Sequence, residues 1–572
     1  MNVKLKYNIP GPSYAANLIM ERGIDPNILL FPNEAHLASP FDLENMQQAV
    51  DAVLHHVGAP TLVVVDSDCD GNCAAAIFIN YIREVFPQWK IDFVVHERKG
   101  HGLEDIAESI DLDEYALIVL PDAGSNDDIY FTSHEYTDFV ILDHHLRTCP
   151  VFEHDNAVLV NNQWSSNYAN KALSGAGVTW QFCRAMDKHL NLELANKYMD
   201  LAAVAIIGDV MNITTPENNY IISTGLKSIT NHFLKLLVDN ASFKLGNTLT
   251  PMGIAFYIVP LINSMCRMGT VDEKERMFLS FIDPHFQVEC HKRGVAAGTK
   301  IDVATESVRE CTNTKAKQSR TQTKMAELCE KQIIEDELLA NKILTIVLDE
   351  TFDDMPSEMN GLTATKLSND YGHPTLIGRV NSDGMLRGSI RGLSTIDMPP
   401  LKVFLNDSGM FEYLEGHDNA AGFSIPYSKL EQFHAWANEQ LKDVDLNTKM
   451  WMVDFDISAN DTALVDIINQ MSELKNYWGQ GFPEALISVR NLSVNRSDIT
   501  VMGKTADTVK IMHNGIAYMF FKKDIEEVKK ITQYQNAIFN IVGTANLNIY
   551  YNKVTPQIFV TDYEIKDNSW GF

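Results

Sequence analysis

The chain has 572 residues and a mass of 64.3 kDa, with 45% hydrophobic, 21% charged and 9% aromatic residues. This composition excludes a mainly disordered, collagen-like or coiled-coil protein, and the length predicts about three to four domains. Because the net charge is −28, bulk charge cannot attract a polyanion, so any nucleic acid has to be held by a local basic patch or by metal ions.

The sequence carries no sign of export or membrane insertion. Its apolar run at residues 201–207 is too short to span a bilayer, and the first residues lack the apolar core of a signal peptide. The eight cysteines include no C-x-x-C pair, which is typical of reduced thiols. We therefore expect a cytoplasmic protein that does not contact a membrane.

The first third of the chain predicts a doubly wound α/β domain. Four short runs are apolar at every position, as in strands buried on both faces of a parallel sheet, and lie at residues 62–65, 116–120, 139–142 and 158–160. A helix at 73–82 separates the first two runs, which gives a strand–helix–strand order.

The rest of the chain divides into three further parts. A mostly helical stretch over 175–291 completes the first domain, and 305–335 predicts a long helix with a basic face at Lys317, Arg320 and Lys324. A second, smaller α/β unit follows from 343 to 433, and short β-rich segments from about 443 indicate a barrel or sandwich. The predicted domains are 1–300, a connecting helix at 301–340, 341–442 and 443–572.

The sharpest local signal is the acidic turn Asp66-Ser-Asp68-Cys-Asp70-Gly71, directly after the first predicted strand. Three carboxylates so close together repel one another unless cations neutralise them, and hard oxygen ligands suit Mg²⁺ or Mn²⁺. An EF-hand loop begins in the same way but needs a bidentate Glu where this chain has Ile77. An acidic surface turn is the remaining alternative for this motif alone.

Metal-type side chains also follow the next two strands. The second strand ends at Asp122 and the third at Asp143, His144 and His145, and Asp209 closes a later apolar helix. Since the carboxyl ends of parallel strands form one ligand crevice, a binuclear cation site is plausible there. His145 can be a ligand, a neighbour of the ligands or an acid.

These motifs, in this order, resemble the DHH phosphoesterase superfamily, which is named after the motif seen here at 143–145. The segments 122–126, 172–178 and 208–210 also fit. Within the superfamily, the chain is most similar to the RecJ-type exonucleases. That resemblance extends to residues 260–267, 387–391, 416–422 and 478–483, and so covers about residues 20–565.

The resemblance implies roles for particular residues. The metal ligands would be Asp68, Asp70, Asp122, His144 and Asp209, with Asp66 matching the motif and Asp143 and His145 as catalytic residues. The nucleic-acid contacts would be Arg267, Asn263, Ser389, Arg391, Gly416, His417 and Arg98. Arginine suits such a role because it grips phosphate bidentately and keeps its charge. For His417 and the small residues after it, we expect a helix start that approaches the nucleotide.

The chain departs from the family pattern on the side that would grip DNA. Glu415 stands where the family has a glycine, and Leu261 where it has an arginine. In the predicted barrel, Tyr518, Phe520 and Phe521 precede Lys522 and Lys523, which suits base stacking, although alternate aromatics in a barrel strand are more often core.

The resemblance implies a 5′-to-3′ exonuclease that uses two divalent cations, Mn²⁺ or Mg²⁺, to degrade single-stranded DNA to 5′-mononucleotides in recombination and repair. It also implies a monomer, with a single-strand-binding protein or a helicase as partners. Two alternatives stay open: a DHH phosphodiesterase acting on short oligonucleotides, as in nanoRNase-like relatives, and a non-catalytic DHH scaffold.

Overall fold

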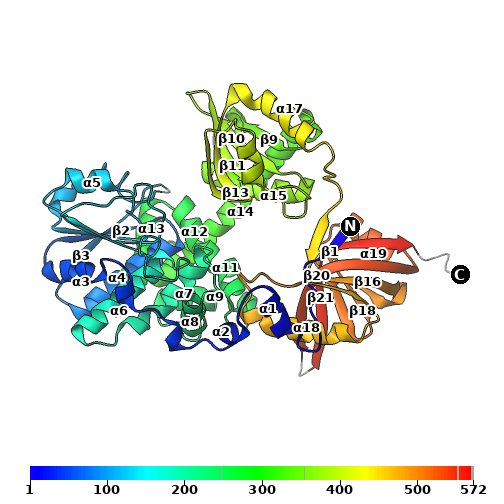
Figure 1. Cartoon of the computed structure of the whole chain (residues 1–572), viewed down its shortest axis with the longest axis horizontal. Helices are drawn as coiled ribbons and strands as arrows, with labels where there is room; N and C mark the ends of the chain where they lie inside the picture. The colour runs from blue at the N-terminus through cyan, green and yellow to red at the C-terminus, as the bar shows by residue number, and fades with distance from the viewer. Residues whose placement is uncertain (99, 247, 353–354, 551–552, 568–572) are drawn as a thin grey trace. The chain divides into compact units, whose positions relative to one another are not determined.

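The computed structural model describes residues 1–98, 100–246, 248–352, 355–550 and 553–567. The chain divides into two compact units (Figure 1). The core unit comprises residues 19–316 and 473–484, and the accessory unit comprises residues 1–18, 317–472 and 485–572. Helix α14 (Val303–Glu335) runs from the core unit into the accessory unit.

The core unit is built on a five-stranded parallel sheet. Its strands, in spatial order, are β3 (Ile91–Val95), β2 (Thr61–Val65), β4 (Leu117–Pro121), β5 (Asp138–Asp143) and β6 (Ala157–Asn161). The four predicted strands are confirmed. The sequence analysis missed β3, an edge strand with Asp92 inside it and with only partial burial of its last three residues.

Both faces of this sheet are buried, which explains why its strands are apolar at every position. Val63, Val119 and Val140 face one hydrophobic cluster, whereas Val64, Ile118 and Ile141 face a second one. At about 25 cal/mol per Å² of buried apolar surface, such burial on two faces is the main stabilising contribution to the unit.

Helices supply the rest of the core unit and cover the sheet (Figure 1). They are α2 (Pro26–Leu30), α3 (Met46–His55), α4 (Cys69–Val85), α5 (Asp128–Ser133), α6 (Gly175–Leu190), α7 (Met199–Gly208), α8 (Pro216–Gly225), α9 (His232–Asn240), α10 (Ser242–Leu245), α11 (Pro251–Tyr257), α12 (Val259–Met268) and α13 (Val271–Ile282). A short hairpin, β7 (Gln287–Glu289) with β8 (Lys300–Asp302), leads into α14. Within the described residues, no helix combines the length and apolar character of a membrane span.

The strand order fixes where a ligand can bind. From β2 the chain moves outward to β3, and from β4 it moves the opposite way through β5 to β6. The order therefore reverses between β2 and β4, and the loops that leave their carboxyl ends diverge there. Such a switch point opens a crevice at the sheet edge.

The accessory unit contains a mixed five-stranded sheet. Its spatial order is β12 (Tyr413–His417), β13 (Ala420–Pro426), β11 (Met385–Arg391), β10 (Thr375–Val380) and β9 (Leu344–Leu348). The helices in this part are α15 (Asn360–Tyr371), α16 (Leu401–Asp407) and α17 (Leu430–Gln440). Figure 1 shows this sheet with α15 and α17 beside it.

The C-terminal part of the accessory unit is a seven-stranded sheet. Its spatial order is β15 (Phe455–Ser458), β16 (Leu486–Asn495), β20 (Asn536–Tyr550), β21 (Lys553–Asp567), β19 (Ile516–Phe520), β18 (Thr508–His513) and β17 (Ile499–Met502). Helices α18 (Ala463–Glu473) and α19 (Ile525–Thr532) accompany it. Helix α1 (Tyr14–Glu21) and the parallel pair β1 (Asn2–Leu5) and β14 (Met450–Val453) complete the elements.

The aromatic run in β19 packs mostly into the core. Tyr518 and Phe520 are fully buried, whereas Phe521, which follows the strand, is 44% exposed. Only Phe521 of the three is therefore accessible to a stacking base. The predicted fold class, a parallel α/β core followed by a smaller α/β part and a β-rich C-terminal part, is confirmed.

Candidate active site

The acidic turn after β2 wraps around the first turn of α4. Asp68 is the N-cap residue of α4, and its Oδ1 accepts hydrogen bonds from the backbone N–H groups of Asp70 (2.8 Å) and Gly71 (3.0 Å). Gly71 is required because a Cβ there would lie 2.4 Å from the Cβ of Asp66. The cap therefore holds three carboxylates at the sheet edge in one fixed turn.

Asp70 is buried against the first turn of α6. Its carboxylate accepts hydrogen bonds from the Ser174 hydroxyl (3.0 Å) and from the backbone N–H groups of Gly175 (2.8 Å) and Ala176 (2.9 Å). A Cβ on Gly175 would lie 2.2 Å from Oδ1 of Asp122, so only glycine lets α6 approach this closely. The segment 172–178, which sequence analysis singled out, thus positions two predicted ligands.

Three buried ligand-type atoms converge at the sheet edge. Nε2 of His144 lies 3.2 Å from Oδ1 of Asp122 and 3.4 Å from Oδ2 of Asp209. Among the described residues, none of these three buried atoms has a hydrogen-bond partner. Buried polar atoms are rarely left in this state, so their convergence fits a cation that they would share.

Burial and neighbouring charges shift the pKa values of the ligand-type side chains. Burial, followed by the charges of Asp70 and Asp68, raises the pKa of Asp122 well above its usual range and that of Asp209 to about 8. Burial and the neighbouring His145 lower the pKa of His144 to about 4, so its imidazole is neutral, as a metal ligand must be. Burial together with Asp66 raises the pKa of Asp68 to about 6.

The carboxylates and His144 form two groups. Asp70, His144 and Asp209 offer ligand atoms that all lie within 4.8 Å of one another, and Asp66, Asp68 and Asp122 do the same. Because Asp122 also contacts His144, it lies where the two groups meet. The donor set, mostly carboxylate oxygens with one imidazole nitrogen, therefore fits a pair of hard divalent cations.

Asp143, which the resemblance implies is a catalytic residue, belongs with Asp122, His144 and His145 to a group whose ligand atoms all lie within 4.8 Å of one another. Its carboxylate is fully buried and accepts hydrogen bonds from the backbone N–H groups of Ser125, His144 and His145 and from Nδ1 of His145 (2.8 Å). Burial alone would raise the pKa of Asp143, but the hydrogen bond from the His145 ring and the charges of the neighbouring histidines keep it well below its usual range. Burial alone would lower the pKa of His145, but Asp143 outweighs it and raises that pKa to about 9.

Sequence analysis missed two further histidines at this edge. Nδ1 of the half-exposed His101 lies 3.0 Å from Oδ1 of Asp66, and its ring centroid lies 4.3 Å from that of His145. The hydrogen bond to Asp66 raises the pKa of His101 against the effect of burial. His96 is fully buried, and its Nδ1 lies 2.7 Å from Asp105. In the sequence, the two glycines that flank His101 are the signal that could have pointed to it.

The candidate nucleic-acid contacts occupy several elements. In the core unit, Arg98 is exposed after β3, and α12 carries both Asn263 and Arg267. Oδ1 of Asn263 accepts a hydrogen bond from the backbone N–H of Cys69 (2.9 Å), so this side chain orients the acidic turn. Arg267 is close enough to Lys315 to lower its pKa, in addition to the effect of burial. A second cation therefore lies beside Arg267.

The remaining candidates lie in the accessory unit. Ser389 and Arg391 are in β11, and Gly416 and His417 end β12. The expectation that His417 and the next residues start a helix is wrong, because they form the turn between β12 and β13. Hydrogen bonding explains why: the backbone carbonyl of Asp418 accepts the N–H of Lys402, and the side-chain Oδ1 of Asn419 accepts the N–H of Leu401, so the turn serves α16 instead of beginning a helix itself.

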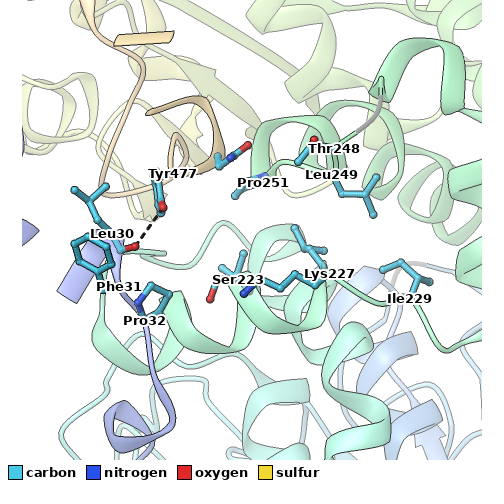
Figure 2. Close-up of a pocket in the computed structure, with 13 residues that line it drawn as sticks. Leu30, Phe31, Pro32, Ser223, Lys227, Ile229, Thr248, Leu249, Pro251 and Tyr477 are labelled. Carbon is cyan, nitrogen blue, oxygen red and sulfur yellow. Dashed lines mark hydrogen bonds between the residues drawn. The ribbon is translucent and has the colours of Figure 1, made fainter. Parts of the chain in front are cut away.

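Two other features of the core unit do not resemble a hydrolytic centre. His291, Glu306 and Glu310 lie together, but Arg276 and Arg309 already pair with the two glutamates. A cavity of about 540 Å³ beside Leu30, Leu249 and Tyr477 has a mostly apolar lining (Figure 2). None of the described residues that line this cavity is acidic or a histidine.

The fold and the converging ligand atoms together define a metal-dependent hydrolase with a parallel α/β core. The family model of the DHH family, N-terminal domain, matches residues 60–206, and that of the RecJ OB domain matches residues 453–562. The chain is 33% identical over 566 residues to the putative SPbeta prophage-derived single-strand DNA-specific exonuclease YorK of Bacillus subtilis, a match that covers 96% of each chain. The chain therefore belongs to the RecJ-type exonucleases of the DHH family.

More distant relatives agree with this assignment. The single-stranded-DNA-specific exonuclease RecJ of Haemophilus influenzae is 23% identical over 490 residues, which is 78% of each chain. The crystal structure of RecJ in complex with Mn²⁺ from Thermus thermophilus has a TM-score of 0.72 at 17% identity, covering 98% of this chain and 80% of that one. This second likeness shows that the fold is shared.

The raised carboxyl pKa values predict how the stability of the metal-free protein depends on pH. Folding raises the pKa of Asp68 and Asp209 above the value near 4 of an unfolded carboxyl, so their contribution to stability is lost as pH rises through their folded pKa values. With chelator present, the melting temperature should fall between pH 6 and pH 8, and Asp209→Asn should reduce this fall. Saturating Mn²⁺ should raise the melting temperature at pH 8. At a Mn²⁺ concentration of a hundred times its dissociation constant, the free energy of unfolding should increase by about 2.7 kcal/mol. A melting temperature that is independent of pH and of Mn²⁺ would contradict the site.

The contact of Gly175 with Asp122 predicts a specific defect. A methyl group in Gly175→Ala collides with the Asp122 carboxylate, so calorimetry should show Mn²⁺ affinity reduced by about tenfold or more. Gly177→Ala is the matched control in the same helix, because the atoms nearest to its methyl group belong to Leu173 and not to a predicted ligand. That variant should bind Mn²⁺ as the wild type does. Equal affinities in the two variants would show that Asp122 does not help to hold the cation.

Proposed function

We propose that this protein is a 5′-to-3′ exonuclease that degrades single-stranded DNA to 5′-mononucleotides with two Mn²⁺ or Mg²⁺ ions, and that it acts in DNA recombination and repair. The observation that carries the proposal is the convergence of three atoms without hydrogen-bond partners among the described residues: Nε2 of His144, with Oδ1 of Asp122 and Oδ2 of Asp209 both within 3.4 Å of it. The similar proteins are named as single-strand DNA-specific exonucleases, which supports the substrate class.

One cation would be held by Asp70, His144 and Asp209 and the other by Asp66, Asp68 and Asp122, with Asp122 between them. The solved relatives with Mn²⁺ and Mg²⁺ support this choice of metals. When bound, a pair of divalent cations stabilises the charge on the phosphodiester and lowers the pKa of water to near neutrality. Within this arrangement, α4 and α6 hold the carboxylates rigidly, so little reorganisation accompanies the reaction.

The residues around the ligands orient the substrate and its protons. Asp143 fixes the ring of His145 through Nδ1, so Nε2 is the ring nitrogen that can reach the substrate. With a pKa of about 9, His145 carries a proton at neutral pH and can donate it to a phosphate oxygen. His101 packs edge-on against the same ring and limits its movement.

The 5′ end would be held by Ser389, Arg391, Gly416 and His417, and the strand behind it by Arg267, Asn263 and Arg98. Arg391 is half-buried beside α15, where its Nε donates a hydrogen bond to the Thr365 hydroxyl (3.1 Å). A guanidinium held in this way needs little further ordering to grip a phosphate.

Further features of the proposal concern organisation and partners. The domains are 1–300, 301–340, 341–442 and 443–572, of which the second is the region of α14. The protein acts as a monomer in the cytoplasm, and a single-strand-binding protein or a helicase presents its substrate. The partly exposed Phe521 and the adjacent lysines are the candidate strand contacts of the C-terminal part.

The experiment that tests this function is degradation of single-stranded DNA labelled separately at each end, with Mn²⁺ present. Wild type should release mononucleotides from the 5′ label first, and Asp122→Ala should lower the rate by at least about a hundredfold, as does removal of one electrostatic contact to a transition state. Asp92→Ala, which removes an exposed acid on β3, is the control and should keep full activity.

Other outcomes of the same assay would identify the alternatives. Inactivity on long DNA with cleavage of dinucleotides or short RNA would replace the proposal by a small-substrate phosphodiesterase. Binding of DNA without any cleavage would indicate a scaffold.

A further inference from the structure

One face of the accessory five-stranded sheet is only partly covered. Strand alternation and register place Arg387, Ser389 and Arg391 of β11 on the same face as Tyr413 and Glu415 of β12. Helix α15 packs on β10 and β11, and Arg391 lies against it at Gly361. Away from α15, Tyr413 is 49% exposed and Arg387 is also exposed.

A hollow of about 510 Å³ lies over this open part of the face. Its lining includes Arg387, Glu412, Tyr413, Gly422 and Ser424. Ser424 is 4% exposed, and its hydroxyl has no hydrogen-bond partner in the part of the chain that the structure describes. The hollow therefore combines an aromatic ring, a guanidinium, a carboxylate and an unsatisfied hydroxyl.

Gly422, in the floor of the hollow, is not required by the packing of the fold. A Cβ on Gly388 would lie 1.9 Å from the carbonyl oxygen of Ile377, and one on Gly378 would lie 2.5 Å from that of Arg387, so packing requires both glycines. By contrast, a Cβ on Gly422 would meet its nearest neighbour, Cε1 of Tyr413, at 3.4 Å, which is ordinary contact. Its φ is not in the left-handed region either. A strand glycine that packing does not require often marks the close approach of a ligand.

The charges around the hollow exclude a phosphate there. Arg387 is already paired with Asp383, and Glu412 and Glu415 add two further carboxylates nearby. The Tyr413 hydroxyl donates a hydrogen bond to Glu415 (2.6 Å), which holds the ring in one position. A fixed, exposed ring next to hydrogen-bond acceptors suits a flat, uncharged group that carries N–H donors.

We propose that the Tyr413–Gly422 hollow binds one nucleobase of the single strand, stacked on Tyr413, with a preference for bases that carry an exocyclic amino group. The proposal deepens the proposed function and rests on it, since it takes the substrate to be a single strand. Ser389 lies directly opposite Gly422 in the register and two residues along β11 from Arg387, at about 7 Å. A nucleotide whose phosphate meets Ser389 and Arg391 thus has its base within reach of the hollow.

The test measures binding of single-stranded oligonucleotides to the full chain in the hydrolysis-deficient Asp122→Ala background. One abasic site is moved stepwise along the oligonucleotide from its 5′ end, and affinity is read by fluorescence anisotropy. Affinity should drop at one position by about 5- to 150-fold, the equivalent of ~1–3 kcal/mol for one base–aromatic stack. Adding Tyr413→Ala should abolish this position-specific drop, and Tyr413→Phe should keep most of it.

Two further variants separate the hollow from general effects. Tyr427→Ala removes a tyrosine that is 47% exposed in the same unit but outside the hollow, and it should leave the abasic profile unchanged. Gly422→Ala should weaken binding at the same position with an unchanged or higher melting temperature, because its methyl group fills the hollow without a clash. A lower melting temperature with an unchanged profile would show that the glycine serves only the fold and would overturn the proposal.

The outcomes distinguish this inference from the proposed function. A flat abasic profile in a protein that binds and, as wild type, degrades single-stranded DNA overturns the nucleobase site alone. No binding and no degradation of single-stranded DNA overturns the proposed function itself. Equal affinity for oligothymidine and oligocytidine would contradict the preference for amino-bearing bases.

Discussion

Repulsion between carboxylates at the edge of the core sheet is the constraint on which the rest of the active site depends. Asp70 and Asp122 are almost completely buried, and Asp66, Asp68 and Asp209 lie close enough to raise the pKa values of their neighbours. Such a cluster is unfavourable in a protein unless something offsets its charge. The fold nevertheless holds it rigidly, with a helix N-cap at Asp68, three donors from α6 on Asp70 and a glycine at position 175.

The order of the strands explains why the cluster lies at this edge of the sheet. The order of strands reverses between β2 and β4, so the loops that carry Asp68 and Asp122 diverge and leave a crevice, while β5 brings His144 to the same edge. The buried Asp143 accepts hydrogen bonds from the backbone N–H of His144 and from the ring of His145. The carboxylates concentrate negative charge at one point, and bound cations convert that point into a binding site for a polyanion. A chain with a net charge of −28 can therefore act on DNA.

The parts of this account that were accessible from sequence are those with strong local signals. Strands apolar at every position predicted the parallel core, and three carboxylates within five residues marked the metal site. Edge strand β3 was missed because Asp92 and its half-buried end interrupt the apolar pattern. His101 reaches Asp66 only through a loop fold that no local periodicity encodes. A helix start was expected at His417 because small residues follow it and would let the backbone approach a nucleotide. In the structure, Asp418 and Asn419 instead accept N–H groups of α16.

The open face of the accessory sheet shows a second kind of feature that could not be predicted from the sequence. The sequence placed Ser389, Arg391 and His417 in one predicted site, yet only the strand register reveals that Gly422 separates Ser389 from Glu415 and that Tyr413 lies beside it. In the sequence, Glu415 is a departure from the family pattern. In the structure, it is the hydrogen-bond partner that holds the Tyr413 ring.

The most direct test of the central claim is the anomalous scattering of Mn²⁺ in crystals of the full-length chain. The account predicts two peaks at the core sheet edge, one beside Asp70, His144 and Asp209 and one beside Asp66, Asp68 and Asp122. An absence of peaks at this edge, or a peak only beside His291, Glu306 and Glu310, would contradict it.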